Sequence, residues 1–220
     1  MTLLHEIKHL VIKDIRLELK QKYAINGILL YIVSTIFLCS LAFERIVMPV
    51  TWNALFWVIL LFAAVNAVSK SFIQESQGRQ LYYYSLASAH AIILAKMIYN
   101  ILMMIVLSVL FFGVFILFLG NYIENQALFF TTMLLGGIGF AALFTMVSAI
   151  ASRTNNNFAL MAVLGFPIIL PLLVLLIKVS KSALLDSGWS GALPSLAALS
   201  GLNIIIIVLS GLLFPYLWRD

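Results

Sequence analysis

The chain has 220 residues, of which 64% are hydrophobic and only 10% are charged, and its mean hydropathy is +1.12. A soluble domain of this size cannot bury so much apolar surface, because much of its surface stays in contact with water. The formal net charge of +5 does not indicate a nucleic-acid-binding protein. The basic residues flank the apolar runs, where they orient a membrane protein and contact anionic lipids. The composition therefore predicts an integral membrane protein.

Residues 1–25 precede the first apolar run and form a separate element. Apolar residues recur in it every three or four positions, and basic residues form a stripe elsewhere on the same helix. The pattern predicts an amphipathic helix at the membrane interface, with its cations toward the lipid headgroups. Packing on a cytoplasmic partner is the alternative, and both can hold at once. The apolar positions are Leu4, Ile7, Val11, Ile15 and Leu19, and the basic positions are His9, Lys13, Arg16 and Lys20.

Six uncharged apolar segments follow, each of roughly 18 to 25 residues, which is long enough to cross a hydrocarbon core of ~30 Å as a helix. The sequence therefore predicts an all-α integral membrane fold with six transmembrane helices. Trp52, Trp189 and Trp218 lie near predicted span ends, where interfacial aromatic residues are expected. The predicted spans are about 26–43, 52–69, 97–119, 127–151, 158–177 and 196–217.

The distribution of Lys and Arg between the loops predicts the orientation. With the N-terminus inside, ten of the 13 basic residues lie on the inner side and three lie on the outer side. Because positive charge accumulates on the cytoplasmic side, both termini are predicted to be cytoplasmic. The inner residues are Lys8, Lys13, Arg16, Lys20, Lys22, Lys70, Arg79, Lys96, Arg153 and Arg219, and the outer ones are Arg45, Lys178 and Lys181.

The predicted spans contain no Asp, Glu, Lys, Arg or His. This absence argues against proton-coupled transport and against a membrane-embedded metalloprotease. The sequence has no glycine-rich phosphate-binding loop, and no nucleophile and base are paired, so no catalytic residue is predicted. His5 and His9 share a helix face at a spacing that suits a metal, but a third ligand is missing and no metal site is predicted.

Two spans carry residues that change how a helix packs. In the fourth, Gly136, Gly137 and Gly139 allow another backbone to approach closely, so we expect a packing role first and a hinge second. In the fifth, Pro167 and Pro171 deprive two carbonyl groups of their amide partners, which predicts a kinked or broken helix. Such a helix suits a translocation path or a curved bundle equally well.

The largest cytoplasmic loop, 70–96, reads KSFIQESQGRQLYYYSLASAHAIILAK. Its first part is predicted to be a short helix in which Glu75 and Arg79 pair at a spacing of four, with Gly78 interrupting it. Tyr82–Tyr84 and the nearby Arg are typical of a protein interface or of an aromatic belt at the membrane surface. The residues alone favour neither.

This loop resembles that of the haem exporter protein B family, CcmB, which reads roughly F-x-x-E-x-x-x-G-x-L-E-x-L and then L-x-K. The second acidic residue and the usual Ser-Pro pair of the family are absent. Three further stretches resemble the family: DIRLELKQKYAINGILLY, GGIGFAALFTMVSAIASRTNNNFAL and GFPIILPLLVLLIK. The resemblance covers nearly the whole chain. In the loop, the matching residues are Phe72, Glu75, Gly78 (with a one-residue shift in some members), Leu81, Leu94 and Lys96.

The resemblance implies an ABC-2-type exporter permease in the bacterial inner membrane, a non-catalytic subunit of the ATP-binding-cassette complex of cytochrome c maturation. Residues 26–220 would be the six-helix permease domain, and the loop 70–96 would couple it to the ATPase. The implied partners are a second copy of the chain, a cytoplasmic ATPase subunit (CcmA), a haem-handling membrane subunit (CcmC), a small subunit (CcmD), a haem chaperone (CcmE) and membrane lipids. The ATPase-contacting residues would be Phe72, Glu75, Gly78, Arg79 and Leu81.

The resemblance also implies that this chain binds no cofactor directly, because ATP binds to the partner and the complex handles haem. No predicted span holds a His, which favours conformational coupling over haem binding by this subunit. Two alternatives remain compatible with the residues: an ABC-2 exporter for a lipid, polysaccharide or drug, and a membrane assembly scaffold without transport. An integral-membrane enzyme is disfavoured by the lack of paired ionisable groups.

Overall fold

The computed structural model describes residues 3–20, 22–43, 47–68, 88–152, 157–185 and 188–219. All regular structure in these ranges is α-helical, as the composition predicts. The helices are α1 (Leu3–Lys20), α2 (Lys22–Ala42), α3 (Pro49–Val68), α6 (Ala89–Leu119), α7 (Gln126–Ala151), α8 (Asn157–Leu184) and α9 (Gly188–Arg219).

Five of these helices are long and apolar enough to cross a membrane, counted over the described residues. The first predicted span lies in α2, whose apolar part Asn26–Ala42 is shorter than the others. The count of six spans and the cytoplasmic placement of both termini therefore stay predictions. The five candidate spans are Pro49–Val68, Ala89–Leu119, Gln126–Ala151, Leu164–Leu184 and Trp189–Tyr216.

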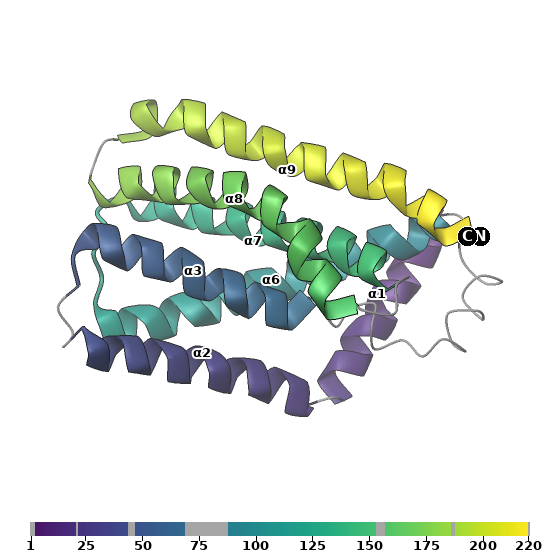
Figure 1. The fold of residues 1–220 in the computed structure, drawn as a ribbon, viewed down its shortest axis with the longest axis horizontal. Helices are drawn as coiled ribbons and strands as arrows, with labels where there is room; N and C mark the ends of the chain where they lie inside the picture. Colours follow the sequence, from purple (N-terminus) through teal and green to yellow (C-terminus); the bar gives the residue numbers. More distant parts are fainter. Residues whose placement is uncertain are drawn as a thin grey trace.

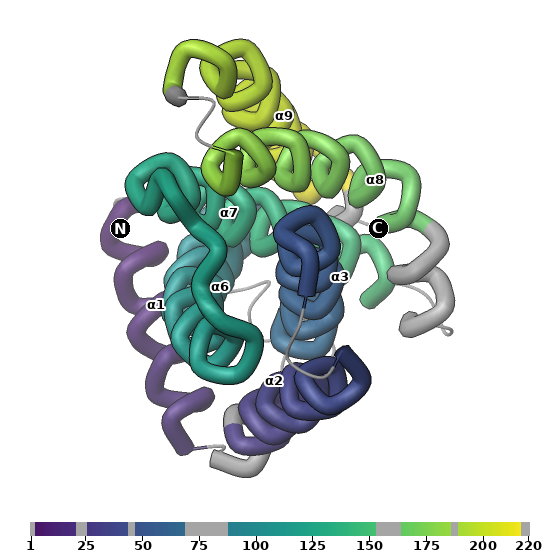
Figure 2. Tube along the Cα trace, turned by 90° about the vertical axis from the view of Figure 1, so that its left-hand side faces the viewer, coloured from purple at the N-terminus to yellow at the C-terminus, as the bar shows by residue number. Residues whose placement is uncertain are grey.

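The apolar helices lie side by side along the long axis of the molecule, and α1 crosses one end of them (Figure 1). Helix α7 is the central element, because it packs against α3, α6, α8 and α9 (Figure 2). Helix α2 packs on α3 and α6, and α1 packs mainly on α6. Movement of α7 would therefore reach four neighbouring helices directly.

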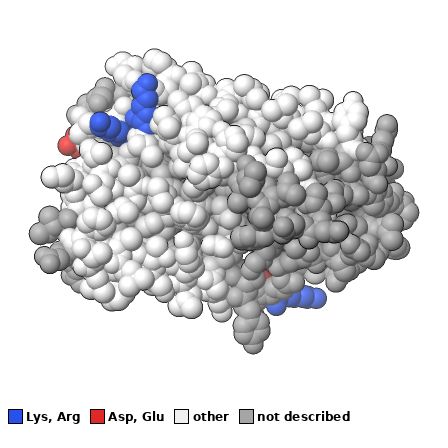
Figure 3. Space-filling view, viewed as in Figure 1, with Lys and Arg blue, Asp and Glu red and all other residues white. Residues whose placement is uncertain are grey.

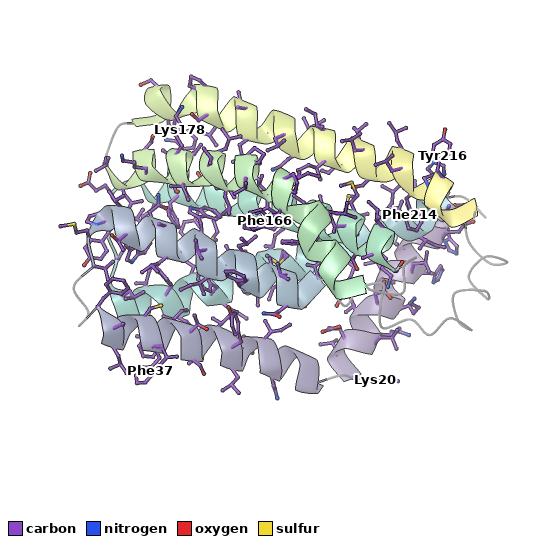
Figure 4. All side chains as sticks on the ribbon, viewed as in Figure 1. Lys20, Phe37, Phe166, Lys178, Phe214 and Tyr216 are labelled. Carbon is purple, nitrogen blue, oxygen red and sulfur yellow. The ribbon has the colours of Figure 1, made fainter. Side chains whose placement is uncertain are left out.

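Charged side chains lie toward the two ends of the face shown in Figure 3, and the described residues between them are uncharged. Lys178 and Lys20, which the distribution of basic residues predicts on opposite sides of the membrane, lie toward opposite ends of the bundle (Figure 4). An uncharged belt between two charged ends is the surface that a bilayer requires.

An aromatic cluster fills the bundle at the end away from α1. Trp52 packs against Phe115 with ring centroids 5.0 Å apart, and Phe56 packs against Phe129 at 5.1 Å. Trp52 is fully buried, and its Nε1 donates to the Gly120 carbonyl at 3.1 Å. Trp52 thus lies at the end of a span as expected, but α6 and α7 cover its ring, so it does not act as an exposed interfacial residue in this chain. Such ring pairs add to the stability that area burial alone provides.

Candidate functional site

The predicted ATPase-contacting residues lie outside the part of the chain that the structure describes. The same is true of Tyr82–Tyr84. The described chain resumes at Ser88, the N-cap of α6, whose Oγ accepts a hydrogen bond from the Ala91 amide at 3.3 Å. The predicted contact residues concerned are Phe72, Glu75, Gly78, Arg79 and Leu81.

Helix α1 forms hydrogen bonds with Ser88, the residue at which the loop between α3 and α6 ends and α6 begins. Glu6 Oε2 accepts hydrogen bonds from the backbone amide and the hydroxyl of Ser88, both at 3.3 Å. A carboxylate in this position also lies at the positive end of the α6 dipole. The predicted interfacial helix therefore contacts the C-terminal part of the predicted coupling loop.

A buried ion pair joins the same two helices eight residues further along each of them. Lys96 Nζ lies 3.6 Å from Asp14 Oδ2, and Lys13 Nζ lies 3.1 Å from Asp14 Oδ1. Asp14 and Lys96 are 7% and 6% exposed. Since both contacts advance by eight residues, α1 and α6 run in the same direction at this junction. We call the contacts of Glu6 with Ser88 and of Asp14 with Lys96 the α1–α6 junction.

The face that α1 turns to the bundle differs from the predicted apolar stripe. Ile7 and Val11 are half-buried, but Leu4 and Leu19 are exposed and the residue of α1 that is buried is Asp14. The ion pair explains the difference, because a carboxylate can face the bundle when Lys96 neutralises it there.

The three glycines of α7 meet different neighbours. A methyl group added to Gly136 would lie 2.6 Å from Trp57 Cζ3, and one added to Gly139 would lie 2.5 Å from Asn203 Oδ1. At Gly137 the nearest atom, Ser108 Oγ, would be 3.5 Å away, which is an ordinary contact. Gly136 and Gly139 therefore lack space for a side chain, whereas Gly137 has it. A hinge at these glycines stays a prediction.

Polar side chains link α7 to helices on either side of it. Asn203 of α9 donates from Nδ2 to the Leu135 carbonyl at 2.9 Å. Asn100 of α6 donates from Nδ2 to Thr145 Oγ1 at 2.8 Å. Hydrogen bonds of this kind are a common means by which transmembrane helices associate.

A third buried polar link joins α3 to α8. Ser180 Oγ accepts from Trp57 Nε1 at 2.7 Å and lies 2.7 Å from Asn53 Oδ1. Asn53 Nδ2 donates to the Ile177 carbonyl at 3.0 Å. Asn53 and Ser180 are not among the residues that the sequence patterns above indicate, although an Asn within an apolar run is a signal of such a link.

Helix α8 continues through both of its prolines and bends partway along its length (Figure 1). The helix is thus bent and not interrupted. Pro167 and Pro171 are exposed and lie on the outer side of α8, while Leu172 is buried. Because proline lacks the amide proton, carbonyl groups on this outer side lose their intrahelical partners. Within a bilayer such groups need a partner from another element.

The two α1 histidines approach each other closely, with Nε2 atoms 3.0 Å apart on the exposed surface. Within the described ranges, no three His, Cys, Asp or Glu side chains are grouped so that they could hold a metal ion. The pair is an exposed hydrogen bond between imidazoles.

These helices, with their uncharged belt, define a multi-pass α-helical membrane protein. The family model described as CcmB protein matches residues 5–215, which is nearly the whole chain. The chain therefore belongs to the CcmB family, the permease component of the haem exporter of c-type cytochrome biogenesis, and the resemblance noted in the sequence is confirmed. The family works with partner components of that exporter, and its permease subunits are generally non-catalytic. Comparison with curated proteins and with solved structures gave no match.

Proposed function

We propose that this chain transmits ATP-driven movements of a separate ATPase subunit into the transmembrane bundle. The observation that carries the proposal is the α1–α6 junction, which fastens α1 to Ser88 and Lys96 in the C-terminal part of the predicted coupling loop. Force applied to that loop would act on α6 and α1 together. Helix α6 is in turn hydrogen-bonded to α7 through Asn100 and Thr145.

In this proposal the loop between α3 and α6 docks on the ATPase. Phe72, Glu75, Gly78, Arg79 and Leu81 form the contact, as the resemblance to the family implies. Nucleotide binding by the ATPase would then favour one of two packings of the bundle, because the two packings present the loop differently to it. The glycines of α7 and the bend in α8 supply the places where the packing changes.

The chain itself binds neither ATP nor haem in this proposal, and the energy of hydrolysis drives release of the haem chaperone (CcmE). Its three histidines support a role without haem ligation. His5 and His9 lie on α1, and His90 lies in the first turn of α6, so the interior of the bundle offers no imidazole.

The assembly proposed is a homodimer of this chain on two ATPase subunits (CcmA), with CcmC and CcmD, in the bacterial inner membrane. The exposed Pro167 and Pro171 support an interface on α8. The carbonyl groups four residues before each proline lose their amide partners, which would be costly against lipid and is better accommodated against protein.

The test is reconstitution of the whole complex, with ATP hydrolysis and chaperone release measured together. Phe72→Ala and Glu75→Ala are expected to reduce chaperone release while hydrolysis continues and the complex still assembles. Gln77→Ala, in the same loop but outside the family pattern, is the matched control. If both loop variants leave hydrolysis and release unchanged, the chain is an assembly scaffold and not a coupling subunit.

A second test measures whether the cell still produces c-type cytochromes. Deletion of the gene, followed by haem staining of c-type cytochromes, is expected to show their loss. Normal cytochrome levels would contradict the haem assignment and favour an exporter for a lipid, polysaccharide or drug.

A further inference from the structure

A groove of about 300 Å³ opens between the C-terminal half of α1, the beginning of α2 and one side of α6. Its wall is apolar along most of its length. The side chains that form most of this wall are Ile15, Leu19, Ile28, Leu102, Val106 and Leu110.

The α6 side of the groove is long and straight. Its lining residues recur every three or four positions from Tyr99 to Leu110, so they form one stripe about 16 Å long. Val106 and Leu110 on this stripe are 61% and 49% exposed. A narrow apolar channel of this size suits a single acyl chain.

The end of the groove next to α1 is polar. Glu18, which is half-buried, and Tyr99 both line it, and the Glu18 carboxylate interacts with the Tyr99 hydroxyl. Arg16 and Lys20 are exposed on the other side of α1 and line a separate pocket, and Lys20 lies where α1 meets α2 (Figure 4). Glu18 is the one charged side chain among the described residues that line the groove, so a lipid headgroup with an ammonium group matches it.

We propose that this groove binds one acyl chain of phosphatidylethanolamine, with the headgroup ammonium on Glu18. An anionic lipid without an amine, such as phosphatidylglycerol, gives Glu18 no cation and places a net negative charge beside it. The bound lipid contacts α1, α2 and α6 at once. It therefore holds the interfacial helix on the bundle beside the α1–α6 junction, independently of whether the chain couples to an ATPase.

Native mass spectrometry of the full-length protein tests the site. The protein is purified in mild detergent and exposed to an equimolar mixture of phosphatidylethanolamine and phosphatidylglycerol with identical acyl chains. The expected result is one retained phosphatidylethanolamine per chain. Glu18→Gln is expected to reduce the preference for phosphatidylethanolamine about fivefold, as for the loss of one partly exposed charge interaction.

A matched pair of valines tests the apolar part of the groove. Val106→Trp fills it and is expected to abolish lipid retention, whereas Val174→Trp on α8, at a position 63% exposed, is expected to leave it intact. Circular dichroism of each variant confirms folding. Equal loss in both valine variants, or preference for phosphatidylglycerol, overturns the proposal. If Val106→Trp disrupts a dimer without changing lipid retention, the groove belongs to a second copy of the chain and the proposal is also overturned.

Discussion

Asp14 and Lys96 lie 82 residues apart in the chain and form an ion pair of 3.6 Å, in which each residue is less than one-tenth exposed. Taking two charges out of water is costly, and their attraction offsets this cost only when both are present. The pair therefore favours one position of α1 on α6. The predicted coupling loop ends at this position, so the pair links the stability of the junction to the proposed function.

The first prediction concerns this ion pair. Asp14→Leu is expected to lower the free energy of unfolding by about 3 kcal/mol, because it removes the Asp14 carboxylate from beside the buried Lys96 ammonium. Lys96→Leu is expected to have a similar effect. The double variant is expected to recover most of the loss, because an apolar pair of similar volume replaces a buried ion pair at little cost. Thermal unfolding of the original protein, the two single variants and the double variant in detergent measures this double-mutant cycle. A double variant whose loss of stability equals the sum of the two single losses would contradict the prediction.

The second prediction concerns the glycines of α7. Gly136→Ala and Gly139→Ala are each expected to destabilise the protein by about 1–3 kcal/mol, because the added methyl group overlaps Trp57 or Asn203. Gly137→Ala is expected to be neutral or stabilising by up to about 1 kcal/mol, since alanine favours the helix. Gly113→Ala on α6, where the added methyl group meets no atom within 4 Å, is the control in open space. Melting temperatures of the variants in detergent measure these changes in stability. Equal destabilisation by Gly136→Ala and Gly137→Ala would contradict the packing described.

The third prediction concerns the polar link between α3 and α8. Ser180→Ala is expected to cost about 1–3 kcal/mol, because it removes the acceptor of Trp57 Nε1 and the hydroxyl beside Asn53 Oδ1. Ser182→Ala, two residues further on, is the matched control, because the Ser182 hydroxyl donates to the Lys178 carbonyl of its own helix at 3.5 Å and to no other helix among the described residues. The link would be shown unimportant if the two variants melted at the same temperature.

The apolar segments of the sequence predict the helices of the bundle well, because hydropathy over about 20 residues is a property of the segment itself. Their ends are less predictable. The third span was expected from residue 97, but α6 begins at Ala89 and includes Lys96. In the sequence, a charged residue such as Lys96 next to an apolar run indicates the end of a span. Here it is buried inside the fold, because Asp14 lies beside it.

The neighbours of the site residues depend on contacts that no local pattern contains. The run of glycines in α7 indicates close approach, but only the fold shows that Gly136 meets Trp57 and Gly139 meets Asn203. Likewise, the apolar stripe of α1 gave no sign that Asp14 is buried, since its partner Lys96 comes from a distant part of the chain. The predicted role of Phe72 and Glu75 rests on the family pattern and remains to be tested by the reconstitution above.

The last prediction concerns the outer face of α8 as an interface between two copies of the chain. Leu170 lies between Pro167 and Pro171 and is 49% exposed. In a Cys39→Ser background, which removes the single native cysteine, Leu170→Cys is expected to form a disulfide-linked dimer in membranes on mild oxidation. The reason is that the carbonyl groups freed by the prolines are better accommodated against a second copy than against lipid. Leu110→Cys on α6 is the matched control, because it has the same residue type and the same exposed fraction but lies in the proposed lipid groove. Non-reducing gels should show the dimer for Leu170→Cys alone. A disulfide-linked dimer for Leu110→Cys instead would indicate that the second copy packs at the groove, which would contradict both the α8 interface and the lipid site.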